Sequence, residues 1–284
     1  MYIVFALLYA FVLGFHEIFK KQARKFSATS TILVMFTSVA FVLSLMWIPM
    51  GIAVSWEFIL IFALKGLLQA ICLFIIIKIL READISLVTT IKLVSVVFTF
   101  IIGITIFGER ASALQFVGIV LILVGVTIIP IISKQEKGEI SLGHIITLLI
   151  SALITTGCEV IDKYTTTYLT NFQVQFWFLL FTFIFSWIFF AVDCIKSKKF
   201  LIKKQDLKNF WIYLVGVTLF VGDLLLFLSY TSADSKMIII TILTKISVII
   251  TVIAGIMLYK EKHIAQKLLL TLLIIAGVVL VAIF

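Results

Sequence analysis

The sequence predicts an all-α polytopic membrane protein, and three observations lead to that fold class. First, its 284 residues are 63% hydrophobic and only 13% charged, whereas a soluble domain carries about 25% charged residues. Second, the apolar stretches are continuous and do not alternate with polar residues, which favours membrane helices over the strands of a barrel. Third, short charged segments such as KKQARKFS and KSKKFLIKKQDLK separate these stretches.

Ten of the apolar stretches are long enough to cross a bilayer, since a membrane helix needs about 20 residues. Polar breaks end each stretch, and the breaks are too short to hold a soluble domain. The predicted spans are residues 2–20, 30–50, 57–80, 85–107, 112–133, 142–163, 171–194, 209–231, 236–259 and 264–284.

Lysine and arginine are distributed unevenly between the predicted loops. The loops after spans 1, 3, 5, 7 and 9, with the residues that border them, hold 17 of the 23 basic residues, and the other four loops hold 3. Basic loops face the cytoplasm in most membrane proteins. The odd-numbered loops are therefore predicted to be cytoplasmic and both termini to lie outside, in a multi-pass protein of the plasma membrane.

The two halves of the chain resemble each other, which predicts repeats over residues 1–134 and 140–284. Each half contains five predicted spans, so the second repeat must be inverted relative to the first. Inverted repeats are typical of secondary transporters, whose binding sites lie at the repeat interface. The matching positions are Gly14 and Gly157, Lys20 and Lys163, Ser95 and Ser247, Gly103 and Gly255, Glu109 and Glu261, and Gly125 and Gly277.

Three segments resemble a known family. IFGERASALQFVGIVLILVGV, which begins at Ile106, resembles the closing signature of EamA-type members of the drug/metabolite transporter superfamily. LYKEKHIAQKLLLTLLIIAGVVLV is a weaker second copy, and LLYAFVLGFHEIFKK resembles the first span of that family. The resemblance covers the whole chain and implies a ten-helix transporter in which spans 4 and 9 line a central cavity.

Lysines within spans 4 and 9 are the first candidate substrate-binding residues. Charged residues deep in a span cost about 2.5–3.5 kcal/mol and usually serve a function. Lys92 shares a helix face with Ser95 and Thr99, and Lys245 has Thr241 one turn earlier. Such faces offer donors to a carboxylate or a phosphate. The alternative is that each lysine only neutralises an acid on a neighbouring helix.

A second candidate pair lies in spans 3 and 8, which correspond to each other in the two repeats. Lys65 is followed by Gln69 one helical turn later, and Asp223 is near the middle of span 8. We expect Lys65 and Asp223 to face each other across one substrate-binding cavity. A purely structural ion pair is the alternative.

Candidate coupling residues lie in spans 1 and 6. His16 could change its charge near neutral pH. Glu159 aligns with His16, one position from Glu17. These residues could bind protons or substrate. Alternatively, Glu17 pairs on its own helix with Lys20 or Lys21, three and four residues later.

The predicted function is secondary-active transport of a small polar, anionic or zwitterionic metabolite by alternating access. Proton coupling and exchange are both open, as are monomer and homodimer. The expected partners are the substrate, protons and membrane lipid, with no nucleic acid. A phosphate-binding loop, a metal motif and a nucleophile–base pair are not recognised, so we expect no enzyme activity and no cofactor. Alternatives are a flippase for a lipid-linked headgroup, a membrane-embedded lipid enzyme and a channel.

Overall fold

A computed structural model of the chain describes residues 1–105, 112–137, 142–231, 240, 243–259 and 264–283. The regular elements in these residues are helices, as the fold class predicts. They are α1 (Tyr2–Arg24), α2 (Thr29–Ser44), the 3-10 helix η1 (Leu45–Met50), α3 (Trp56–Ile79), α4 (Ile85–Ile91), the 3-10 helix η2 (Lys92–Val94), α5 (Ser95–Thr105), α6 (Ala113–Lys137), α7 (Leu142–Tyr168), α8 (Asn171–Ser197), α9 (Lys204–Leu207), α10 (Phe210–Thr231), α12 (Ser247–Tyr259) and α13 (Ile264–Ile283).

Several helices are long and apolar enough to cross a membrane. Seven such stretches occur in the described residues, and three shorter apolar helices lie over Ala113–Ile128, Leu243–Tyr259 and Ala265–Val281. The positions of all ten coincide with the predicted spans. A multi-pass helical membrane protein is therefore confirmed, while the count of ten crossings stays a prediction.

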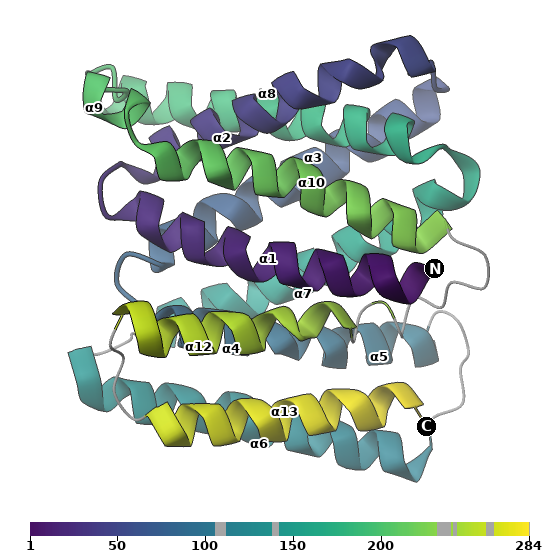
Figure 1. Ribbon diagram of the computed structural model, residues 1–284, viewed down its shortest axis with the longest axis vertical. Coiled ribbons are helices and arrows are strands. Elements are labelled where there is room, and N and C mark those ends of the chain that lie inside the picture. Colours follow the sequence, from purple (N-terminus) through teal and green to yellow (C-terminus); the bar gives the residue numbers. More distant parts are fainter. Residues whose placement is uncertain (106–111, 138–141, 232–239, 241–242, 260–263, 284) are drawn as a thin grey trace.

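The helices lie side by side in layers (Figure 1). The pair α6 and α13 forms one edge of the molecule, and α2 and α8 lie toward the opposite edge. Between them, α1 packs against α10 and α12, and α7 packs against α3 and the α4–α5 segment. Both termini lie at the same side of the bundle, at the right of the view. The middle layer therefore combines helices from both halves of the sequence.

The edge pair α6 and α13 is in direct backbone contact. A Cβ atom built on Gly118 would lie 2.6 Å from the carbonyl oxygen of Gly277, and one built on Gly277 would lie 2.6 Å from the oxygen of Gly118. Small residues at such crossings allow membrane helices to approach closely, where van der Waals packing drives association.

The helix that corresponds to predicted span 4 is interrupted, although the sequence predicts a continuous span over 85–107. Its α-helical pattern changes to a 3-10 turn at Lys92–Val94 before α5 begins. One turn earlier, the Thr89 and Thr90 hydroxyls donate to the carbonyl oxygens of Ile85 and Ser86 at 2.8 and 2.6 Å. Such back-bonding often bends helices. The interruption places Lys92 in the 3-10 turn between α4 and α5.

Predicted span 9 shows a similar interruption. Residues 243–245 are helical, Ile246 forms a turn, and α12 begins at Ser247. The bonds from Ile246 N to Leu243 O (3.2 Å) and from Ile249 N to Ile246 O (3.0 Å) have 3-10 spacing. Lys245 therefore lies at a helix break, as Lys92 does.

Candidate functional site

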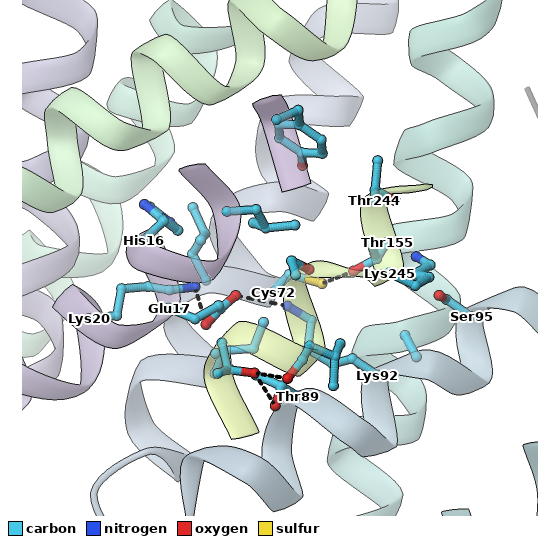
Figure 2. A pocket seen from close by; sticks show the side chains of 18 of the residues that line it. His16, Glu17, Lys20, Cys72, Thr89, Lys92, Ser95, Thr155, Thr244 and Lys245 are labelled. Atoms are coloured by element: carbon cyan, nitrogen blue, oxygen red, sulfur yellow. Dashed lines mark hydrogen bonds and ion pairs between the residues drawn. The ribbon is translucent and has the colours of Figure 1, made fainter. Parts of the chain in front are cut away.

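Two adjoining cavities lie in the middle layer. The central cavity is lined by α1, α3, α7, α10, the α4–α5 break and residues 244–251, and Figure 2 shows its polar side chains. The side cavity lies between α1, α3, α7, α8 and α10. Their volumes are about 140 and 80 Å³, and a water molecule needs roughly 10–15 Å³ of such space, so both can hold water. Six residues line both: Tyr9, Gln69, Thr155, Glu159, Asp223 and Thr244.

Two lysines share one carboxylate at the wall of the central cavity. Lys20 Nζ lies 2.8 Å from Glu17 Oε2, and Lys92 Nζ lies 3.1 Å from Glu17 Oε1 (Figure 2). Lys20 is 1% and Glu17 is 3% exposed. When all three are ionised, this cluster carries one surplus positive charge. Of the two lysines considered for Glu17, Lys20 is the partner, while Lys21 donates to the carbonyl oxygens of Leu80 and Ala83.

A related pair comes from the second half of the chain. Lys245 Nζ lies 3.4 Å from Glu159 Oε1, and both residues line the central cavity. The other carboxylate oxygen, Glu159 Oε2, is buried without a hydrogen-bond partner in the described structure. Lys92 and Lys245 therefore each pair with an acid and also line the cavity, and substrate binding by these lysines stays a prediction.

Acids outnumber lysines in the side cavity. Lys65 is ion-paired with Asp162 on α7, and its ammonium lies 3.5 Å from the centre of the Phe178 ring. Asp223 lines the same cavity, as predicted for a residue opposite Lys65, but its Oδ2 atom is buried without a hydrogen-bond partner in the described structure. With all three groups ionised, Lys65, Asp162 and Asp223 carry one surplus negative charge.

The remaining predicted residues are placed differently. His16 lines the central cavity and shares a 3.0 Å hydrogen bond with Thr218 on α10. Ser95 also lines it, and its hydroxyl has no partner among the described residues. Thr99 donates to the Ser95 carbonyl at 3.0 Å and is not among the residues that line the described cavities. Thr241 lies outside the described residues.

Sequence reasoning missed several lining residues. Lys20 was predicted as a repeat position and as a possible partner of Glu17, but not as a residue that lines the central cavity. The spacing of three residues between Glu17 and Lys20 is enough to predict their contact. The pairing of Asp162 with Lys65 could not be predicted in this way, because it depends on how α7 packs against α3. Two thiols also line the site, Cys72 in the central cavity and Cys158 in the side cavity. Among the described residues, no group of histidine, cysteine and acidic side chains could hold a metal ion.

The two cavities and their paired charges lie within a bundle of apolar helices. Residues 1–130 match the EamA-like transporter family. The match confirms the family resemblance that the sequence predicts, and the protein is a membrane protein similar to EamA-like transporters. No curated protein matches the sequence significantly.

A solved structure has a similar fold. It is titled "Crystal structure of protein", and the similarity covers 98% of this chain and 94% of that chain with a TM-score of 0.66. At 11% sequence identity, this similarity concerns the fold alone. It extends beyond the EamA-like match and includes the second half of this chain.

Proposed function

We propose that this protein is a secondary-active transporter that carries a small zwitterionic metabolite by alternating access. The observation that carries the proposal is the uneven distribution of buried charge. The cluster of Glu17, Lys20 and Lys92 has a surplus positive charge, and the group of Lys65, Asp162 and Asp223 has a surplus negative charge. A substrate with one carboxylate and one ammonium group would compensate both.

Each end of such a substrate has a matching group in the cavities. Lys92 lies at a helix break, and its side chain is 23% exposed, so its ammonium can add a substrate carboxylate to its contact with Glu17. Asp223 has an oxygen without a partner and can accept from a substrate ammonium. Because a buried charge is costly unless it is paired, a ligand that pairs both sites stabilises the bound state. A singly charged anion would compensate only the first site.

The packing of the helices supports alternating access between two inverted repeats. α10 packs on α1 as α3 packs on α7, and α10 packs on α2 as α3 packs on α8. Glycines lie at both of the latter crossings: Gly216 faces Val39 of α2, and Gly66 faces Phe181 of α8. Each of these contacts therefore has a counterpart made by the corresponding helices of the other half. Such symmetry is expected of a transporter in which one repeat rocks against the other.

Ligand binding provides the first test of this proposal. Purified protein is heated with amino acids, sugar phosphates, choline-like cations or lipid-linked sugars, because a ligand that binds the native state raises the Tm by mass action. We expect zwitterions to raise the Tm more than anions or cations of similar size. A shift with lipid-linked sugars alone would contradict the proposal and favour a flippase.

Transport by site variants provides the second test. We expect Lys92→Ala and Lys245→Ala to reduce uptake of the identified zwitterion into proteoliposomes at least tenfold, while both variants still reach the membrane. Lys199→Ala is the matched control, because Lys199 is exposed in the turn after α8. Full uptake by both purified site variants would overturn the assignment.

A further inference from the structure

Asp223 is an acidic residue that forms no ion pair among the described residues. It lies in the middle of α10, next to Gly222, where a Cβ atom would lie 3.5 Å from the Tyr9 ring. Asp223 lines both cavities, yet its Oδ2 atom is buried and accepts no hydrogen bond in the described structure. A buried polar atom of this kind needs an explanation, since almost all such atoms are paired in native proteins.

The lysine that lines the side cavity and the lysine that pairs with Glu159 are both engaged with other acids. Lys65 of α3 is ion-paired with Asp162 of α7, and Lys245 is paired with Glu159. The described parts of α2 and α8 bring no charged side chain to either cavity. The ionisable groups that face the two cavities near Asp223 are Tyr9, His16, Glu17 and Lys20 from α1, Lys65 and Cys72 from α3, Lys92 from η2, Cys158, Glu159 and Asp162 from α7, Tyr230 from α10, and Lys245.

An ionised Asp223 would therefore share one lysine with a second carboxylate. Two acids on one buried cation favour the state in which one of them is protonated, because like charges cannot both be compensated. The contacts of the two acids indicate which of them is protonated. Asp162 contacts the Lys65 ammonium directly, whereas the Oδ2 atom of Asp223 does not contact any donor among the described residues.

We propose that Asp223 is a proton-binding residue for which a proton and the ammonium group of the substrate compete. This inference rests on the proposed function. Without substrate, the Asp223 carboxyl group is neutral. When an ammonium group enters, the carboxyl proton passes to cavity water on the open side, and the resulting carboxylate pairs with the ammonium. After release on the other side, Asp223 takes a proton from water there. One proton then crosses against each substrate molecule.

The coupling candidates suggested by the sequence, His16, Glu17 and Glu159, are less suited to this exchange. Glu17 is held by Lys20 and Lys92, so its protonation would leave two cations without their shared counter-charge. His16 is 4% exposed and bonded to Thr218. Glu159 is held by Lys245. Protonation of Asp223, in contrast, removes a surplus charge.

Infrared spectroscopy of purified, ligand-free protein tests the proton site directly. We expect the carbonyl stretch of a protonated carboxyl group in the wild type, lost as the pH is raised, and absent from Asp223→Asn. Asp193→Asn is the matched control and should keep the band, because Asp193 lies near the end of α8 and lines neither cavity. In wild-type protein, ¹³C-carboxyl labelling of aspartate should shift the band, and labelling of glutamate should not. This labelling test does not depend on whether a variant folds. A titrating band that survives in folded Asp223→Asn would overturn the proposal.

Competition is tested on the same band at constant pH with two probes, methylammonium chloride and sodium acetate. We expect methylammonium to reduce the band in the wild type and acetate to leave it unchanged. If methylammonium raises the Tm but leaves the intensity of the band unchanged, the proposed competition is overturned. These measurements need no transport. A protein that binds protons but carries no substrate therefore gives a positive infrared result and a negative proteoliposome result. Failure of the proton site can thus be told apart from failure of the proposed transport function.

Discussion

At the scale of single residues, the pair Lys65–Asp162 is an enclosed charge pair of the side cavity. Lys65 is 1% and Asp162 is 5% exposed, and the Phe178 and Phe227 rings lie beside the ammonium. Removing one member of a buried pair is costlier than removing both, because it leaves an uncompensated charge. The stability of this region should therefore depend on the pair as a unit.

This dependence can be measured with a double-mutant cycle. We expect Lys65→Met or Asp162→Leu alone to lower the free energy of unfolding by about 3–5 kcal/mol, and the double variant to recover most of that loss. Unfolding in mixed detergent micelles provides the measurement. Lys199→Met, an exposed control, should change it by less than about 0.5 kcal/mol. Single variants as stable as the wild type would show that the pair contributes little.

The sequence could predict the charged residues of the site but not their partners. Lys65, Lys92, Lys245 and Asp223 are identifiable because a charge inside an apolar stretch is costly. Which acid meets which lysine depends on the rotation and neighbours of each helix, which a hydropathy pattern does not contain. Asp162 illustrates this, because only the contact of α7 with α3 brings it to Lys65.

At the scale of helices, glycines determine how closely neighbouring axes approach. In α3, a Cβ atom on Gly66 would lie 2.8 Å from the carbonyl carbon of Phe181 and 2.9 Å from the nitrogen of Thr182. These are backbone atoms of α8, so a side-chain rotation cannot relieve the clash. In α7, by contrast, a Cβ atom on Gly157 would meet nothing within 4 Å.

Matched alanine substitutions test this difference. We expect Gly66→Ala to lower the free energy of unfolding by about 1–3 kcal/mol through overpacking. Gly157→Ala should be neutral or stabilise by up to about 1 kcal/mol, because alanine favours the helix. Thermal unfolding in detergent compares the two variants. Equal losses in both would show that glycine flexibility, and not close packing, matters at Gly66.

Helix positions were predictable, whereas the interruptions were not. Long apolar stretches and charged breaks locate the helices because the bilayer requires both. The breaks at Lys92 and Ile246 carry no proline or glycine, so the sequence gives no strong signal for them. Hydroxyl back-bonding by Thr89 and Thr90 is a local effect that becomes clear only with the geometry.

At the scale of the whole molecule, the charges of the two cavities form a dipole. One lysine is in surplus around Glu17 and one acid is in surplus around Lys65. Composition predicted a membrane protein, and the repeats predicted a transporter, but this separation of charge follows from assembling helices of both halves around one space. The sidedness of the loops stays a prediction from the distribution of lysine and arginine.

The two buried cysteines lie at opposite ends of this dipole. Cys72 lines the central cavity with the surplus lysine, and Cys158 lines the side cavity with the surplus acid. At a pH high enough to ionise Asp223, we expect an anionic methanethiosulfonate to label Cys72 faster than Cys158, and a cationic one to show the reverse preference. Mass spectrometry of peptides from a Cys194→Ser background measures both rates. The same preference for both reagents would contradict the charge separation. The chain thus contains one native chemical reporter for each cavity, which can be read before any substrate is known.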